Sequence, residues 1–231
     1  MKDDYPSKPR ILVFASGTKD GGGSGFQELV EFSKTTPPVL DAEIVGVVSN
    51  HPQGGVWQKA KKLDILFCHW PGPFESGDYV YYVRKFEADY VMLSGWLKLV
   101  HGLDPARTVN IHPGPLPEFG GPGRYGHHVH EVVMRAYREG KITQSAVSMH
   151  FVDERYDHGP IFFQLPVLIR PEDTPETLAG RLNEKERAWQ AHVLNLVVNG
   201  YIRLQSVPSG WQLIAKKKFT GEIPGFTGRY I

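Results

Sequence analysis

The sequence is poor in cysteine, in long apolar runs and in net charge, and each shortage excludes a class of protein. Its one cysteine, Cys68, excludes an internal disulfide and any metal site built from several thiolates, which suits a reducing compartment. No apolar run approaches the roughly 20 residues of a membrane span. The N-terminal segment is charged and contains proline where a signal peptide needs an apolar stretch. We therefore expect a cytoplasmic protein that does not bind membranes.

The charges nearly balance, which argues against a highly charged partner. The 26 basic and 25 acidic residues leave a formal net charge of +1, so the composition indicates no nucleic-acid partner. The 231 residues, 41% of them hydrophobic, are enough to bury a sizeable core. Small molecules are the expected partners.

Apolar runs alternate with segments of helical periodicity through the first half of the chain. The pattern predicts strands over 11–15, 44–49, 65–67, 90–93 and 108–111, and helices over 26–34, 56–63 and 79–86. Such alternation is typical of a parallel sheet covered by helices. The first 100 residues are therefore predicted to form the mononucleotide-binding half of a doubly wound fold.

The second half changes to longer strands and longer helices. We expect a helix over 127–138, strands over 146–152 and 161–169, a helix from 175 to at most 199, and one or two short strands after 201. Thr174 and Pro175 supply the N-cap and first position of the long helix. No repeat or linker divides the chain. We predict one α/β domain over 1–231, with a doubly wound, mostly parallel twisted sheet and helices on both faces. Its parts are 1–100, a catalytic half over 101–200, and a tail over 201–231, in which lysines 216–218 form a solvated face.

A glycine-rich segment, Ser16 to Gly25, lies between the first predicted strand and the first predicted helix. Ligands of open α/β sheets bind beyond the carboxyl ends of the strands, where a helix N-terminus favours an anion. The segment matches neither the ATP P-loop nor the usual dinucleotide fingerprint. It predicts a phosphate site, and a plain flexible turn is the alternative.

Asn110 and His112 stand two residues apart where a strand runs into the proline-rich segment 113–117. Side chains two apart on a strand point to the same side, and the prolines stiffen the chain behind them. An amide N–H₂ and a protonated imidazole aimed at one carbonyl oxygen would stabilise the charge that develops when an amine attacks it. Asp157, between two predicted strands, is a candidate to move the amine's proton. The alternatives are a structural histidine, an asparagine that caps a turn, and a turn aspartate.

A metal site is the remaining chemical possibility. His127, His128 and His130 lie close together, but no carboxylate or thiol accompanies them in a recognised spacing. We predict no metal.

Four motifs, taken in order, resemble the folate-dependent phosphoribosylglycinamide formyltransferases over about the first 200 residues. They are Ser16-Gly17 with Gly23-Ser24, Ser94-Gly95-Trp96-Leu97, Asn110-Ile111-His112-Pro113, and His150-Phe151-Val152 leading to Asp157-His158-Gly159-Pro160. The resemblance implies transfer of the formyl group of 10-formyltetrahydrofolate, as co-substrate, to the amine of glycinamide ribonucleotide in purine biosynthesis. It implies a catalytic Asn110, His112 and Asp157, no metal, and a monomer or homodimer.

The resemblance also assigns binding residues. The phosphate of the ribonucleotide would meet Gly23, Ser24 and Gly25, and its ribose would meet Glu186. The residues implied for the folate are Trp96, Leu97, Lys98, Leu99, Val100, Glu154, Arg155, Tyr156, His158 and Gly159.

Three segments differ from the family pattern: the insertion at 18–21 with Gly25 in place of the usual asparagine, the loop 114–126, and His158 in place of glycine. These differences leave a folate-dependent N-formyltransferase for a sugar nucleotide as an alternative. A non-catalytic nucleotide-binding module is the alternative from another class. The methionyl-tRNA formyltransferases resemble this domain too, but carry an additional C-terminal domain that the tail is too short to supply, and formyltetrahydrofolate hydrolases carry an additional N-terminal one.

Overall fold

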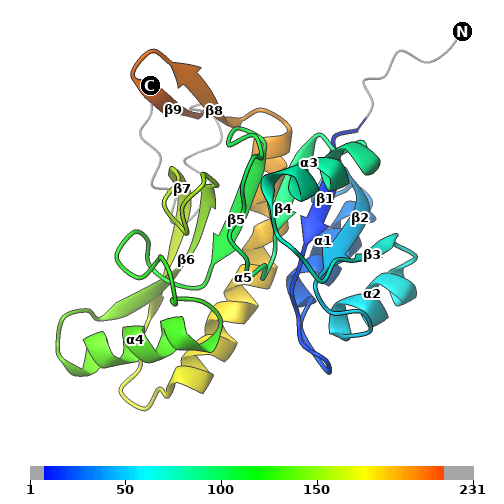
Figure 1. The fold of residues 1–231 in the computed structure, drawn as a ribbon. Coiled ribbons are helices and arrows are strands. Elements are labelled where there is room, and N and C mark those ends of the chain that lie inside the picture. Colours follow the sequence, from blue (N-terminus) through cyan, green and yellow to red (C-terminus); the bar gives the residue numbers. More distant parts are fainter. Residues whose placement is uncertain (1–7, 216–231) are drawn as a thin grey trace, which may run out of the picture.

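A twisted seven-stranded sheet forms the centre of the protein, whose computed structural model describes residues 8–215 (Figure 1). The strands are β1 (Arg10–Phe14), β2 (Glu43–Ser49), β3 (Phe67–His69), β4 (Tyr90–Leu93), β5 (Thr108–His112), β6 (Gln144–Phe151) and β7 (Ile161–Leu168), with β8 (Ile202–Val207) and β9 (Gly210–Ala215) in a separate hairpin. The helices are α1 (Ser24–Ser33), α2 (Gly55–Leu63), α3 (Ser76–Lys85), α4 (His127–Arg138) and α5 (Pro175–Val198).

The sheet order is β3-β2-β1-β4-β5-β6-β7. Strands β1 to β5 are parallel, whereas β6 pairs antiparallel with both β5 and β7. The predicted doubly wound, mostly parallel sheet is therefore confirmed. The chain moves outward from β1 in one direction to β3 and then in the other direction from β4, so the switch point lies between β1 and β4.

Two hydrophobic layers hold the sheet between helices. On β1, Ile11 and Val13 belong to one buried cluster and Leu12 and Phe14 to the other, as alternation along a strand requires. The first cluster takes in residues of α1, α2, α4 and α5, and the second takes in Tyr79 of α3. Burial on both faces explains why the strands of the first half read as continuous apolar runs.

One predicted strand, over 65–67, is displaced by two residues. Asp64 ends α2 in the left-handed conformation with φ of 56°, and the N–H of Ile65 donates to the carbonyl of Ala60. Ile65, the first residue of the predicted strand, therefore belongs to the turn that ends α2, and the strand begins only at Phe67.

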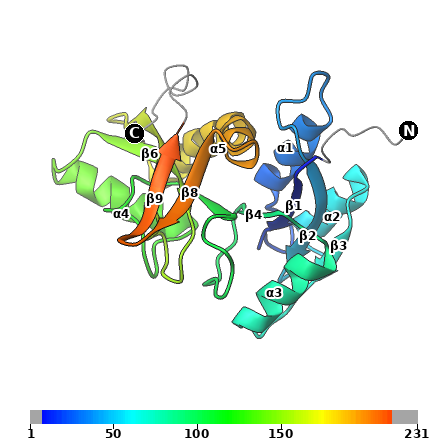
Figure 2. The ribbon, with the colours of Figure 1, turned by 90° about the horizontal axis from the view of Figure 1, so that it is seen from above.

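Helix α5 is the longest element and crosses beneath the middle of the sheet. Thr174 caps it by accepting from the N–H of Thr177, and Pro175 follows, as predicted. Seen from above, α5 lies between α1 on one side and α4 on the other (Figure 2). It therefore contacts both halves of the chain. The β8–β9 hairpin follows it, and lysines 216–218 lie outside the described residues.

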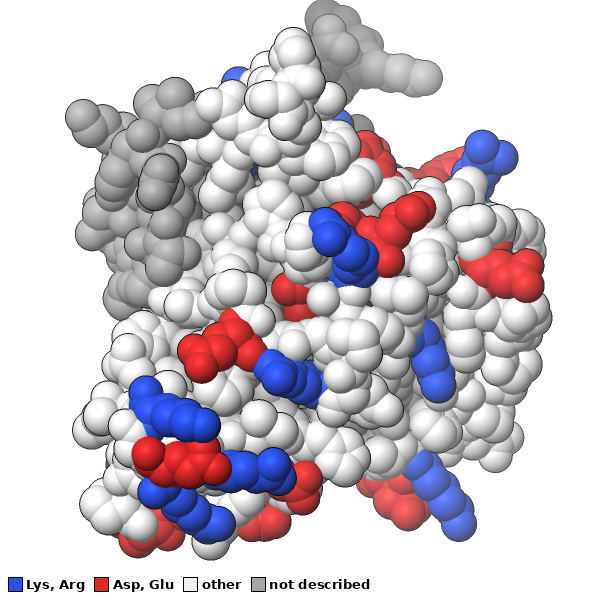
Figure 3. Space-filling view, turned by 60° about the vertical axis from the view of Figure 1, so that its left-hand side comes forward, with Lys and Arg blue, Asp and Glu red and all other residues white. Residues whose placement is uncertain are grey.

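On the face drawn in Figure 3, basic and acidic side chains alternate and neither sign forms a continuous patch. Within residues 8–215, none of the helices combines the length and apolar character that crossing a bilayer would need.

Candidate active site

A cavity of about 450 Å³ opens at the carboxyl ends of β1, β4 and β5. Its walls come from the glycine loop after β1, residues 94–97 after β4, the end of β5, the loop before α4, Tyr156 and Asp157, and one face of α5. This is the switch point of the sheet, where strand ends diverge and leave a crevice. Residues of the glycine-rich segment, predicted to bind phosphate, and the three predicted catalytic residues thus line the same cavity.

Asn110, His112 and Asp157 lie in contact inside this cavity. The Nδ2 of Asn110 donates to Oδ1 of Asp157 over 3.3 Å, and Nδ1 of His112 lies 3.6 Å from the same oxygen. The side chains of His112 and Asp157 are only 5% and 11% exposed. Position 157 is 45 residues beyond position 112, and the β6–β7 loop brings it back to the end of β5.

The protonation of His112 follows from its two contacts. Its Nε2 lies 3.0 Å from the carbonyl of Phe119, which can only accept, so Nε2 carries a hydrogen. Nδ1 is then the nitrogen that faces Asp157 and can gain or lose a proton. Burial lowers the pKa of His112, and the nearby charge of Asp157 and the bond to Phe119 only partly oppose this. Burial therefore favours the neutral imidazole before the reaction.

Asp157 is held as a carboxylate in the left-handed backbone conformation, which residues other than glycine adopt only rarely. Its φ is 51°, and its Oδ2 accepts from the N–H of Gly121 over 3.1 Å. Burial alone would raise the pKa of Asp157, but its contacts with His150 and His112 and the hydrogen bond from Gly121 outweigh burial and hold the pKa below its usual value. A Cβ on Gly120 would come within 2.7 Å of the Cβ of Asp157, so this close approach needs glycine at position 120.

His150 is a fourth polar residue of this cluster, and the sequence analysis gave it no role. It faces Asn110 across the β5–β6 pair, and its Nδ1 lies 2.8 Å from the carbonyl of Phe151. Nδ1 therefore carries a hydrogen, and Nε2 accepts from Nδ2 of Asn110 over 3.0 Å. Both N–H bonds of the Asn110 amide thus point at protein atoms. A substrate oxygen has to replace one of them.

His130 was also missed as a cavity residue, since the sequence analysis weighed it only as a metal ligand. It lines the cavity from the first turn of α4, is 5% exposed, and its Nδ1 has no partner among the described residues. Burial lowers its pKa to about 4, so this imidazole is neutral. Its position next to the loop that differs from the family pattern was the only signal in the sequence.

The glycine loop forms an open turn above the start of α1. Gly17, Gly22 and Gly23 all have positive φ, and the N–H of Thr18 donates to the carbonyl of Gly21 over 2.9 Å. Helix α1 begins at Ser24 without a side-chain cap or an acidic residue in its first turn. Its first N–H groups therefore remain suited to an anion.

Glu186 lines the same cavity from α5. It is partly exposed to the cavity, and the desolvation of its carboxyl group raises the pKa to about 7. Gly23, Ser24, Gly25 and Glu186 thus all line the same cavity.

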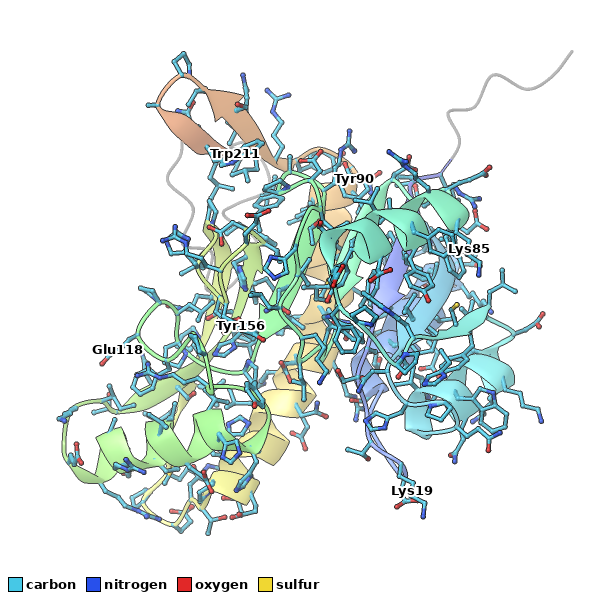
Figure 4. All side chains as sticks on the ribbon, in the orientation of Figure 1. Lys19, Lys85, Tyr90, Glu118, Tyr156 and Trp211 are labelled. Carbon is cyan, nitrogen blue, oxygen red and sulfur yellow. The ribbon has the colours of Figure 1, made fainter. Side chains whose placement is uncertain are left out.

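The residues implied for the folate are divided between two places. Trp96, Leu97 and Tyr156 line the main cavity, and Figure 4 shows Tyr156 near the middle of the molecule. The other implied residues do not line the main cavity. They are Lys98 with Nζ 5.3 Å from the Phe74 ring, Leu99 with its carbonyl accepting from Tyr79 and its backbone bonded to Tyr156, Val100, Glu154 and Arg155 along a second pocket beside Trp211, His158 against Asp153, and Gly159 against the carbonyl of Phe151.

Within residues 8–215, no group of three or more His, Cys, Asp or Glu side chains is arranged to hold a metal ion. One crevice of a doubly wound sheet thus holds a glycine-rich loop, the uncapped start of α1 and a buried Asn–His–Asp cluster. This combination defines an α/β enzyme that acts on small molecules.

The model of the formyl transferase family matches residues 9–194. This chain belongs to the formyl transferase family.

Three relatives illustrate the similarity. The chloroplastic phosphoribosylglycinamide formyltransferase of Arabidopsis thaliana is 31% identical over 92% of this chain and 73% of its own. The trifunctional purine biosynthetic protein adenosine-3 of Bos taurus is 32% identical over 86% of this chain, which spans only 19% of that protein. The crystal structure of phosphoribosylglycinamide formyltransferase from Bacillus halodurans has 28% identity and a TM-score of 0.68, and covers 82% of this chain and 95% of its own.

Proposed function

We propose that this protein transfers the formyl group of 10-formyltetrahydrofolate to the amino group of glycinamide ribonucleotide, a step of purine biosynthesis. The observation that carries the proposal is that Asn110, His112 and Asp157 meet within 3.3 to 3.6 Å in a cavity reaching the glycine loop and Trp96. Relatives with this activity in their names cover most of the chain.

The lining of the cavity suits the two substrates. The free N–H groups of the glycine loop and the first turn of α1 favour a phosphate, and the carboxylate of Glu186 can accept from ribose hydroxyls. The side chains of Trp96, Leu97 and Tyr156 offer apolar surface for a pterin ring. The polar cluster lines the same cavity, where the amine of one substrate would meet the formyl group of the other.

The reaction needs one bond formed, one broken and one proton moved. The amine nitrogen attacks the formyl carbon, and the tetrahedral intermediate places negative charge on the former carbonyl oxygen. The amide of Asn110 can donate to that oxygen after giving up its hydrogen bond to His150 or to Asp157. His112 stabilises the negative charge on the oxygen as an imidazolium, once Nδ1 has gained a proton.

The bond from the formyl carbon to N10 of the folate then breaks. Nδ1 of His112 receives the one proton that the attacking amine loses, the neighbouring carboxylate of Asp157 stabilises the resulting imidazolium, and this proton then passes to N10. The transfer is direct and forms no covalent intermediate with the enzyme.

Formyl transfer to a sugar nucleotide would use the same cluster, and the loop 114–126 lies beside it.

The test is to incubate the protein with 10-formyltetrahydrofolate and to follow the folate product with glycinamide ribonucleotide, with an amino-sugar nucleotide, and without acceptor. Turnover that depends on glycinamide ribonucleotide supports the proposal. Turnover only with the sugar nucleotide would show that the sugar nucleotide is the acceptor. Turnover without acceptor would indicate hydrolysis, and binding without turnover would indicate a non-catalytic nucleotide-binding module. Cytoplasmic location and a monomeric or homodimeric state stay predictions.

A further inference from the structure

Gln190 is a buried amide on the face of α5 that lines the cavity together with Glu186 and the glycine loop. Its side chain lines the cavity although the residue is only 1% exposed. It lies one helical turn after Glu186, so the two side chains share a face of α5. Amides are seldom buried this deeply unless their polar atoms have partners.

Both polar atoms of Gln190 bind groups that come from distant parts of the chain. Its Nε2 donates to the carbonyl of Gly25 in the first turn of α1 over 3.0 Å. Its Oε1 accepts from the hydroxyl of Ser94, just beyond β4, over 2.9 Å. One side chain therefore joins the glycine loop, the end of β4 and α5.

This bridge depends on the absence of a side chain at position 25. A Cβ on Gly25 would lie 2.3 Å from Oγ of Ser94 and 3.1 Å from Oε1 of Gln190. Any larger residue at position 25 would have to displace the serine hydroxyl, the glutamine amide or the backbone. Gly25, Ser94 and Gln190 thus fit together as a set, which we name the acceptor bridge.

A second link between α1 and α5 is closer to solvent. Nε of Arg187 lies 2.9 Å from Oε1 of Glu28, and the two side chains are 45% and 20% exposed. Exposed ion pairs fix positions only weakly because water and salt compete with them. The buried bridge is therefore the polar contact that can set the spacing of the two elements beside the cavity.

We propose that Gln190 is a positioning residue that fixes the glycine loop relative to Glu186, and so sets the spacing between the phosphate and ribose sites of the acceptor. The inference rests on the proposed function for the identity of that acceptor. It extends that proposal by naming a residue that acts on acceptor affinity through the protein backbone.

The test compares Gln190→Leu with the double variant Gln190→Leu/Ser94→Ala. Leucine is similar in size but leaves the serine hydroxyl and the Gly25 carbonyl without their partner, so Gln190→Leu is expected to lose thermal stability. The double variant removes the buried hydroxyl and should regain part of that stability. Gln27→Leu, which removes a surface bond to Glu31 on α1, is the matched control.

The readout is the affinity for ribose 5-phosphate by calorimetry, which does not require formyl transfer, together with the KM values for both substrates. We expect Gln190→Leu and the double variant to weaken ribose 5-phosphate binding and raise the acceptor KM by roughly tenfold, the scale of a displaced binding group. The folate KM and the Gln27→Leu control should change by less than about twofold.

Three outcomes would overturn the inference: unchanged affinity in Gln190→Leu, affinity that returns with stability in the double variant, or a wild-type protein that does not bind ribose 5-phosphate. If ribose 5-phosphate binds and the variants weaken it while no formyl transfer occurs, the inference stands and the proposed function fails.

Discussion

Replacing Asp157 by asparagine should leave the fold intact and lower kcat by on the order of 10²-fold. The size follows from the 3.6 Å between Oδ1 of Asp157 and Nδ1 of His112. At an effective dielectric constant of about 20, a carboxylate attracts an imidazolium at this distance by roughly 4 to 5 kcal/mol. Desolvation offsets part of that attraction. A net loss of about 2.7 kcal/mol from the protonated state of His112 corresponds to a hundredfold lower rate.

The fold should survive because the asparagine keeps suitable partners. Its amide oxygen can accept from the N–H of Gly121, and its N–H₂ can donate to the unprotonated Nδ1 of His112, although it no longer accepts from Asn110, which keeps His150 as a partner. The melting temperature and the KM values should therefore change little, while kcat falls.

The assay is the initial rate of folate product formation with saturating substrates, alongside thermal unfolding. Asp153→Asn is the matched control, because it makes the same chemical change four residues earlier in the same loop, at a side chain that contacts His158 instead of the cluster. A rate for Asp157→Asn within about threefold of wild type would remove Asp157 from the mechanism.

Three further changes test other parts of the site. His112→Ala should lower kcat more than it raises the acceptor KM, since the imidazole acts mainly on charge that forms after attack; a change in KM alone would contradict this role. The acceptor KM should rise as pH falls through about 7, where Glu186 takes up a proton, and Glu186→Gln should abolish that pH dependence. Because folding raises the pKa of Glu186, its contribution to stability is complete below its unfolded pKa and is lost as pH rises through about 7. In Glu186→Gln, the melting temperature should no longer fall over this pH range. Gly120→Ala should reduce kcat because its new Cβ would lie 2.7 Å from Asp157; full activity would show that the loop yields freely.

The strands of the sheet could be predicted because burial on both faces produces continuous apolar runs. The same reasoning placed Asn110 and His112 side by side, since residues two apart on a strand share a side. It missed the role of His150 because the pairing of Asn110 with His150 depends on the antiparallel register of β5 and β6. Register is set by packing and turn geometry, which no local pattern states.

The acceptor bridge could not be predicted from the sequence either. Gln190 reads as one more polar residue in a long helix, and only the packing of α1 against α5 shows that its amide meets Gly25. Lys98, Leu99 and Val100 illustrate the opposite case. The family resemblance grouped them with Trp96 and Leu97, whereas the structure places them outside the lining of the main cavity, beside Phe74, Tyr79 and a separate pocket.

The antiparallel addition of β6 explains how one sheet edge acquires a catalytic cluster. A parallel strand beside β5 would start at the far edge of the sheet and end at the cavity, in the same direction as β5. Because β6 runs the other way, its pairing sets His150 against Asn110, and the loop that follows carries Asp157 back over the end of β5. A slip of one residue in this register would turn His150 to the opposite face and remove one of the two acceptors of the Asn110 amide. The chemistry therefore depends on the strand that departs from the parallel pattern.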